Sequence, residues 1–142
     1  MTMANEIMKV DVNTMLAQDA GTMLCTIPAD PNDRKTMARI FKALNDPTHR
    51  VGDFINKDIK VENILIETAD ILNEETGEIS RVPRVVLITP EGESYQAVSM
   101  GMFNAVKNAF RCFGSAPWNP ALTFAIKQKP VKNGSMLTAD VY

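Results

Sequence analysis

From residue 58 onward, the apolar positions mostly alternate with polar ones, which is the period of a β-strand. The stretch "DIKVENILIETADIL" (58–72) is rich in β-branched residues, and its apolar face switches midway. This pattern predicts one long, curved strand with a bulge. Further strands are predicted at 82–89 and 94–99, with polar turns at 73–78 and 90–93.

A helical period interrupts the strands after residue 98. Ser99 can cap this helix and Gly114 can end it. Its apolar face would consist of Met102, Phe103, Val106, Ala109, Phe110 and Phe113. Two more alternating runs, 121–129 and 135–142, flank Asn133-Gly134. Since Asn-Gly between alternating runs is the strongest short hairpin signal, these runs are predicted to pair.

The first third of the chain predicts one clear helix. Asp30 is its expected N-cap, with Pro31 at the first helical position, and it should end before Pro47. The predicted apolar stripe is Met37, Ile40, Phe41 and Leu44, and the other faces carry Arg34, Lys35, Arg39 and Lys42. A solvated face is the favoured interpretation of these four cations, ahead of a nucleic-acid contact. Residues 7–12 and 22–27 suggest short strands around a helical turn at 13–18.

The order of these elements predicts the fold class. We expect a mainly β protein with two helices, built as an OB-fold-like five-stranded barrel in the order strand-strand-strand-helix-strand-strand. Residues 58–142 would form the barrel, and residues 1–57 an N-terminal α/β extension that packs on it within one compact domain. SH3-like barrels and α+β sheets share parts of this order, but the helix in the middle is not typical of them.

Charge is distributed unevenly along the chain. Its 142 residues carry a net charge of −2, and 45% of them are hydrophobic, which argues against disorder. Residues 1–80 hold 8 basic and 14 acidic residues, a net charge of −6, whereas residues 81–142 hold 7 basic and 3 acidic residues, a net charge of +4. Such asymmetry suggests a polyanionic partner for the basic half, although chance patchiness is the alternative.

Enzyme and membrane signatures are missing from the sequence. His49 is the only histidine, and no metal spacing, phosphate-binding glycine loop or nucleophile elbow is present. We therefore expect no catalytic residues, no metal and no cofactor. Cys25 and Cys112 are interpreted as small buried hydrophobic residues. Without a signal peptide or an apolar run of about 20 residues, a cytoplasmic location is expected.

The candidate binding residues follow from the predicted barrel. OB barrels bind nucleic acid through strands two and three and through the loops joining strands one to two and four to five. The predicted phosphate-neutralising cations are Arg81, Arg84, Lys127, Lys129 and Lys132, with Lys57 and Lys60 nearby. The predicted base-stacking rings are Tyr95 and, less favoured than a place in the core, Trp118; Phe54 and Tyr142 are open candidates.

Two observations keep other interpretations open. Lysines on a hairpin also protect an edge strand from pairing, as in a small β-barrel interaction module or structural phage subunit without nucleic-acid binding. An OB-type carbohydrate or tRNA binder is a third candidate. The 73–78 turn carries Glu74, Glu75 and Glu78, which repel phosphate. DNA would bypass this end of the molecule, or the turn would contact another protein.

Three segments resemble a known family: "NDPTHRVGDFINKDIKVENILIE", "EETGEISRVPRVVLITPEGESYQAVSMGMFNAVKNAFRCFG" and "KQKPVKNGSMLTADV". They are similar to small single-stranded DNA-binding proteins of tailed phages, including those near the protein-primed phages of Firmicutes. The likeness covers residues 35–142. It implies an OB-type fold and no enzymatic activity.

The same resemblance implies sequence-independent binding of single-stranded DNA during phage replication, in the cytoplasm of the bacterial host. The positions it carries over are Arg84, Tyr95, Lys127, Lys129 and Lys132. A replication protein such as a DNA polymerase, or a second copy of the chain, remains an open candidate for a protein partner. One departure is the ending "LTADVY", which is not the acidic tail that recruits partners in many single-strand binding proteins.

Overall fold

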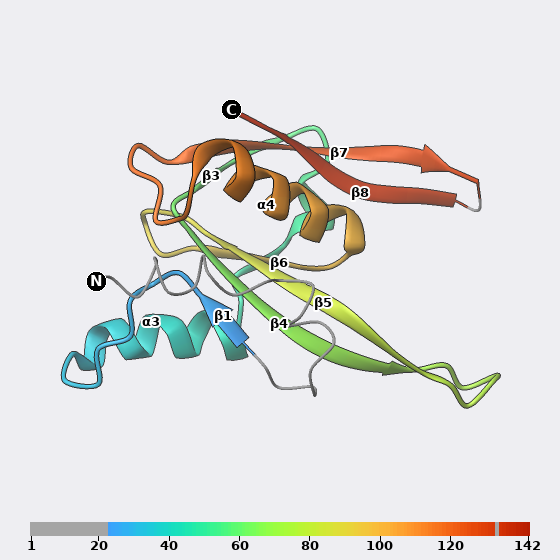
Figure 1. Ribbon diagram of the computed structural model, residues 1–142, viewed down its shortest axis with the longest axis horizontal. Helices are drawn as coiled ribbons and strands as arrows, with labels where there is room; N and C mark the ends of the chain where they lie inside the picture. Colours follow the sequence, from blue (N-terminus) through green and yellow to red (C-terminus); the bar gives the residue numbers. More distant parts are fainter. Residues whose placement is uncertain (1–22, 133) are drawn as a thin grey trace.

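The computed structural model describes residues 23–132 and 134–142, which form two β-sheets and two α-helices (Figure 1). A three-stranded sheet has the order β3-β7-β8, and a five-stranded sheet has the order β1-β4-β5-β6-β2. The strands are β1 (Met23–Cys25), β2 (His49–Arg50), β3 (Asp58–Val61), β4 (Asn63–Leu72), β5 (Ile79–Ile88), β6 (Ser94–Val98), β7 (Leu122–Val131) and β8 (Gly134–Val141). The predicted strands from residue 58 onward are present, as is the one at 22–27, while residues 7–18 lie outside the described part.

The predicted long strand 58–72 is divided at Glu62, where the chain passes from one sheet to the other. The Glu62 backbone N–H donates to the Ile88 carbonyl at 2.9 Å, and its carbonyl accepts from the Trp118 N–H at 2.9 Å. These bonds satisfy the backbone groups at the break. The face switch in the sequence thus marks the place where the chain crosses from the three-stranded sheet to the five-stranded sheet.

The main core lies between the two sheets and is closed by α4 (Met100–Phe113). Ser99 caps α4 by accepting from the Met102 N–H at 3.2 Å, and Gly114 follows the helix with a φ of 83°. Met102, Phe103 and Val106 are fully buried. The second predicted helix is confirmed, except that Phe113 at the end of its apolar face is half exposed.

The first helix, α3 (Arg34–Asn45), covers the other face of the five-stranded sheet and differs from its prediction in two ways. Its N-cap is Asp33, which accepts from the backbone N–H groups of Lys35 and Thr36; hydrogen bonds from Thr36 lower the pKa of Asp33. The predicted cap, Asp30, instead closes the preceding turn. Phe41, predicted to be buried, is 64% exposed. The buried positions of α3 are Ile40 and Ala43, because the helix packs through a narrow stripe.

The sheets do not close into a barrel, so the predicted OB-like barrel is not confirmed, although a mainly β composition with two α-helices is confirmed for the described residues. No pairing joins β6 to β8 in the described part of the chain. The start of α4 occupies that place, and the Ser99 hydroxyl donates to the Leu137 carbonyl at 3.3 Å. A Cβ at Gly101 would overlap this same carbonyl oxygen, so the close approach of helix and strand requires glycine.

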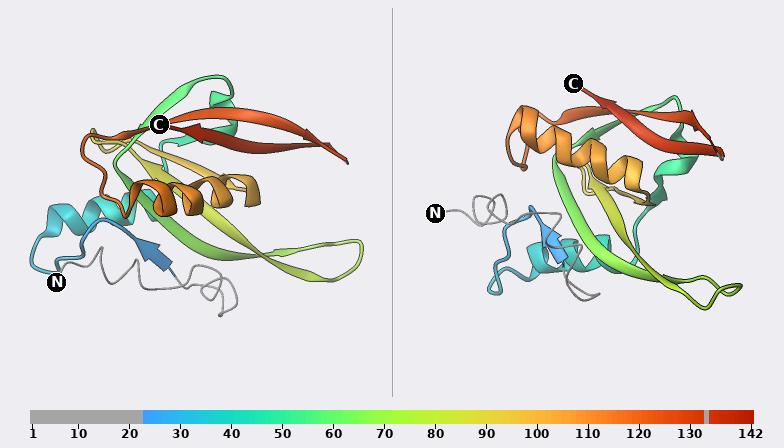
Figure 2. Two further views of the ribbon diagram at one scale, coloured as in Figure 1. Left: turned by 45° about the horizontal axis from the view of Figure 1, so that its top comes forward. Right: turned by 45° about the vertical axis from the view of Figure 1, so that its right-hand side comes forward.

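Two hairpins project beyond the sheets on the same side of the molecule (Figure 2). In the first, residues 68–72 of β4 and 79–83 of β5 pair only with each other among the described residues. We call residues 68–83 the acidic arm, since its 73–78 turn holds three glutamates; Gly77 in this turn has a φ of 74°, as its predicted role requires. In the second, β7 and β8 extend beyond β3. We call residues 127–138 the basic arm, since it holds three lysines and no acid.

Between residues 51 and 54 lies one turn of 3-10 helix, η1 (Val51–Phe54).

The prediction that both cysteines are buried is wrong for Cys112. Cys25 is partly buried, and burial raises the pKa of its thiol, whereas Cys112 is exposed on α4. No helix of the described residues is long and apolar enough to cross a membrane.

Candidate functional site

The basic arm presents its lysines to solvent. Phe124 and Ile126 of β7 point into the core, so the alternation of the strand turns Lys127 and Lys129 to the opposite side. Lys132 lies at the turn and is exposed. Lys127 forms an ion pair with Asp140, which raises the pKa of the lysine. Lys129 and Lys132 form no ion pair with any residue that the structure describes.

The side of the three-stranded sheet that carries these lysines, here the outer face, also carries an aromatic ring. The backbone of Tyr142 pairs with Thr123, whose cross-strand neighbour on β3 is Lys60. Residues opposite one another share a face, so Tyr142 and Lys60 lie on the outer face. The Tyr142 side chain is 64% exposed, and its hydroxyl donates to Asp58 at 3.3 Å. The charge of Asp58 raises the pKa of Tyr142.

The two predicted arginines are held in ion pairs away from this face. Arg84 donates to Glu67 at 2.9 Å and to Gln96 at 3.2 Å, and its side chain is 12% exposed. Arg81 donates to Asp70 at 3.2 Å across the acidic arm. The structure does not bring either arginine to the basic arm. Both charges already have carboxylate partners on the five-stranded sheet.

The predicted stacking ring of Tyr95 is in the core. It is 8% exposed, lies against His49 with ring centroids 4.7 Å apart, and meets Phe54 edge-on at 4.9 Å. Its hydroxyl donates to Glu93 at 3.1 Å; burial, and next this hydrogen bond, raise the pKa of Tyr95. A base could stack on this ring only if the core opened, so we leave Tyr95 and its neighbour Phe54 out of the interface.

Trp118 is also in the core, as the favoured interpretation held. It is 5% exposed and packs between Phe110 and Phe124, with centroid distances of 5.6 and 6.1 Å. Its indole N–H donates to the Gly114 carbonyl at 3.1 Å. The buried ring and its satisfied donor are typical of a structural tryptophan.

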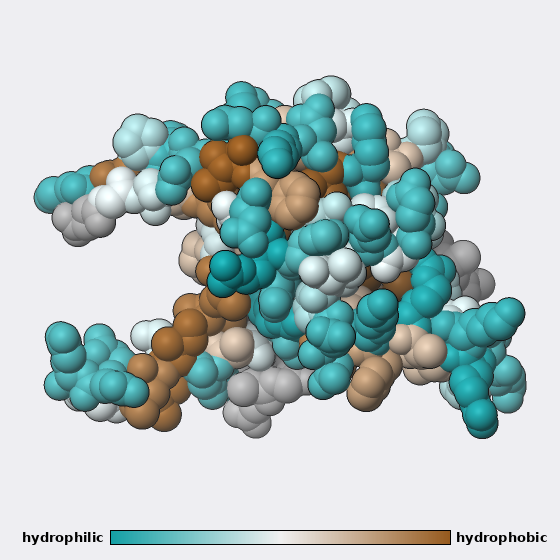
Figure 3. Space-filling model, turned by 180° about the vertical axis from the view of Figure 1, so that it is seen from behind, coloured by the Kyte–Doolittle hydropathy of each residue, from teal (hydrophilic) through white to brown (hydrophobic). Residues whose placement is uncertain are grey.

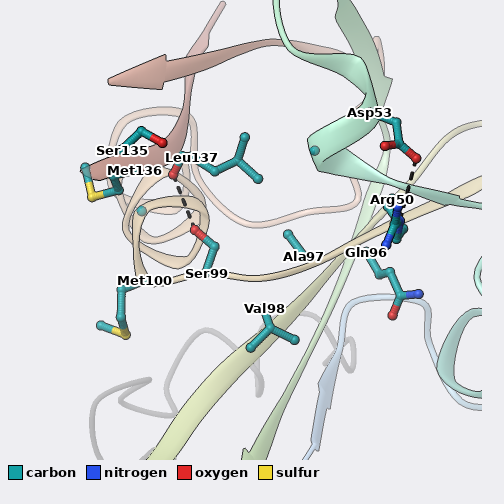
Figure 4. A pocket seen from close by; sticks show the side chains of 12 residues that line it. Arg50, Asp53, Gln96, Ala97, Val98, Ser99, Met100, Ser135, Met136 and Leu137 are labelled. Atoms are coloured by element: carbon teal, nitrogen blue, oxygen red, sulfur yellow. Dashed lines mark hydrogen bonds and ion pairs between the residues drawn. The ribbon is translucent and has the colours of Figure 1, made fainter. Parts of the chain in front are cut away.

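A groove of about 730 Å³ lies where β6 fails to meet β8. Figure 4 shows Arg50 and Asp53 at one end of it and Ser135, Met136 and Leu137 at the other. Val98 and Met100 are half exposed along it. The arginine at its end is paired with Asp53 at 3.6 Å. The groove therefore offers apolar surface but little uncompensated positive charge, in contrast to the basic arm.

A comparison with protein-family models identifies the family of this chain. The model described as phage single-stranded DNA-binding protein, of the Phi29 type, matches residues 20–141. The chain belongs to this family. The resemblance seen in the sequence is thereby confirmed, and it makes the chain a single-stranded DNA-binding phage protein in general terms. The family is a non-enzymatic DNA-binding family. In the described residues, no group of three or more His, Cys, Asp and Glu side chains could hold a metal ion.

Searches of curated proteins and of solved structures each returned no match. For this member of the phage family, the location of the DNA contact therefore has to be argued from its own geometry. That geometry adds Lys60 and Tyr142 to Lys127, Lys129 and Lys132. A usable signal was in the sequence: counting outward from Asn133-Gly134 places Tyr142 on the face of the lysines, and the observed register, in which Val131 pairs with Gly134 and Thr123 with Tyr142, does so as well.

Proposed function

We propose that this phage single-stranded DNA-binding protein coats single strands without sequence preference during phage DNA replication, through its basic arm and the outer face beside it. The observation that carries the proposal is the pair Lys129 and Lys132, projecting on an arm without a single acid and without ion-pair partners in the described residues. Lysines without a carboxylate partner in the described residues are available to bind phosphates. Phosphate neutralisation dominates affinity for nucleic acids.

The chemistry of the outer face favours binding without sequence preference. Lysine ammonium groups are flexible point charges that contact phosphates, and every base has a face that can stack on the exposed ring of Tyr142. β8, eight residues long, separates Lys132 from Tyr142, which is about 27 Å at 3.4 Å per residue. A short single strand can run along this length. The carboxylates of Asp58 and Asp140 are occupied by Tyr142 and Lys127, which limits their repulsion of phosphate.

In this role the protein would act in the cytoplasm of the bacterial host, where coated strands would be substrates for a DNA polymerase. Coating protects the strand and keeps it from pairing. The acidic arm projects apart from the basic arm (Figure 3), so its glutamates need not lie against the DNA. Arg81 and Arg84, being paired on β4 and β5, would support the five-stranded sheet rather than contact the DNA.

The test is fluorescence anisotropy with a labelled oligo-dT, competed by unlabelled single strands of mixed sequence and by duplex of the same length. We expect mixed single strands to compete as well as oligo-dT, and duplex to compete far less. No binding at low salt, or equal competition by duplex, would refute the proposal. A strong preference for one sequence would refute its sequence-independent part.

A further inference from the structure

The exposed side of α3 combines positive charge with an uncovered aromatic ring. Arg34, Lys35 and Lys42 are exposed on the same helix as Phe41, which is 64% exposed, and none of the three cations forms an ion pair with a described residue. We call these four residues the α3 face. Arg34 and Lys35 also occupy the first turn of the helix, where the helix dipole disfavours cations. Their charges therefore do not serve the helix itself.

The acidic arm has the opposite charge and its own uncovered apolar side chains. Glu74, Glu75 and Glu78 are exposed in the turn, without ion-pair partners in the described part of the chain. Beneath them, Leu72 and Ile79 are cross-strand neighbours on one face of the hairpin, and are 58% and 68% exposed. Figure 3 shows this apolar stretch leading to a hydrophilic tip. Exposed aliphatic pairs on a projecting two-stranded ribbon are typical of a surface that another molecule covers.

These two surfaces match each other in charge and in apolar content. The three glutamates of the acidic arm carry the charge opposite to that of the three cations of the α3 face. The exposed side chains of Leu72 and Ile79 offer an apolar site for Phe41. They lie at opposite ends of the long axis of the molecule, α3 at one end and the tip of the β4–β5 hairpin at the other (Figure 1). The arm cannot reach α3 of its own chain, so the match can be satisfied only between copies.

We propose that the acidic arm of one copy binds the α3 face of the next, in a head-to-tail contact. Such a contact joins two different patches, so it does not close on itself as a twofold dimer does and can continue from copy to copy. Neither patch includes the basic arm. Resting on the proposed function, the contact would bring successive copies onto one DNA strand, so that binding of one favours binding of its neighbour.

DNA is the other candidate ligand for the α3 face, since cations around an exposed ring can also hold a single strand. That assignment leaves the exposed Leu72 and Ile79 beside three glutamates unexplained, because a phosphate chain would avoid them. A second copy accounts for both surfaces at once. The two assignments predict different effects of reversing the charges of the α3 face. If this face binds DNA, a single copy loses affinity for a short oligo-dT, whereas if it binds a second copy, that affinity is retained.

The test uses two charge-reversed variants of the full chain and sedimentation velocity over a concentration series. One variant is Glu74→Lys/Glu75→Lys/Glu78→Lys, and the other is Arg34→Glu/Lys35→Glu/Lys42→Glu. We expect the native protein to associate as concentration rises and each variant alone to associate at least about tenfold more weakly, as the loss of a charge-paired contact predicts. Mixed in equal amounts, the two variants should associate again, because each reversed surface meets its reversed partner.

Lys107→Gln/Arg111→Gln on α4 is a control for altered surface charge away from both patches, and circular dichroism checks that each variant is folded. Native protein that stays monomeric at every concentration, or a mixture of folded variants that fails to associate, would overturn the inference. Binding to an oligo-dT of about 10 nucleotides, near the site of one copy, separates the two proposals. If the α3 variant alone loses this binding, α3 is a DNA surface and the inference fails; if no protein binds it, the proposed function fails.

Discussion

Removing the two unpaired lysines of the basic arm should weaken DNA binding in a salt-dependent way. Lys129 and Lys132 have no carboxylate partner in the described residues, so each is free to neutralise one phosphate. The variant Lys129→Ala/Lys132→Ala changes exposed positions only, and Lys129 pairs across the hairpin with Met136 without a packing role in the core. The fold and its stability should therefore be unchanged.

The expected magnitude follows from counterion release. Each phosphate contact contributes about −0.7 to the slope of log K against log salt for single strands. The double variant should therefore make this slope shallower by ~1.4. At 0.1 M salt this corresponds to about 5-fold in affinity per contact and about 25-fold, or ~1.9 kcal/mol, for both. Lys127→Ala should cost less than either, since Lys127 is already paired with Asp140.

Anisotropy titrations of labelled oligo-dT at five or six salt concentrations measure the slope directly. Lys107→Gln/Arg111→Gln is the control, since it removes the same net charge from α4. We expect this control to keep the native slope. A double variant with an unchanged slope, or a control with an equal loss, would refute the assignment of the DNA contact to the basic arm.

Three further changes test the surrounding structure. Tyr142→Ala should weaken oligo-dT binding by the ~1–3 kcal/mol of one stacked base, while Tyr142→Phe retains it; equal loss in both variants would argue against stacking. Gly101→Ala should lower the free energy of unfolding in urea by ~1–3 kcal/mol, because its methyl group would overlap the Leu137 carbonyl. Arg84→Ala removes the partner of the partly buried Glu67 carboxylate and should destabilise the fold by ~1.5–3 kcal/mol, with the DNA affinity of the folded protein unchanged. Native-like urea midpoints would contradict both stability predictions.

The sequence predicted the elements well because their signals are local. The cap at Ser99, the turn at Gly77 and the hairpin at Asn133-Gly134 depend only on neighbouring residues, and alternation identified the strands. The barrel was a different kind of inference, since it depends on whether β6 and β8 pair. That pairing is prevented by the approach of Gly101 to β8, which is a long-range contact without a local signal.

The candidate site shows the same limit. The lysines of the basic arm are exposed as predicted, because a hairpin tip has few neighbours to cover it. The aromatic predictions required knowledge of which face each strand buries. Tyr95 faces the core and Tyr142 faces solvent, and the exposure of Phe41 reflects how narrowly α3 packs on its sheet. Arg84 was recognisable as a cation, but its partner Glu67 lies on the neighbouring strand and could be identified only through the register.

The most direct test of the DNA contact is a titration of the ¹⁵N-labelled protein with a short oligo-dT, followed by ¹H–¹⁵N NMR. The account predicts that the largest shift changes fall in residues 127–132, at Lys60 and toward Tyr142, while the amides of the acidic arm and of α3 keep their positions. Shift changes concentrated on α3 or in the groove between β6 and β8, with the basic arm unaffected at saturation, would contradict it.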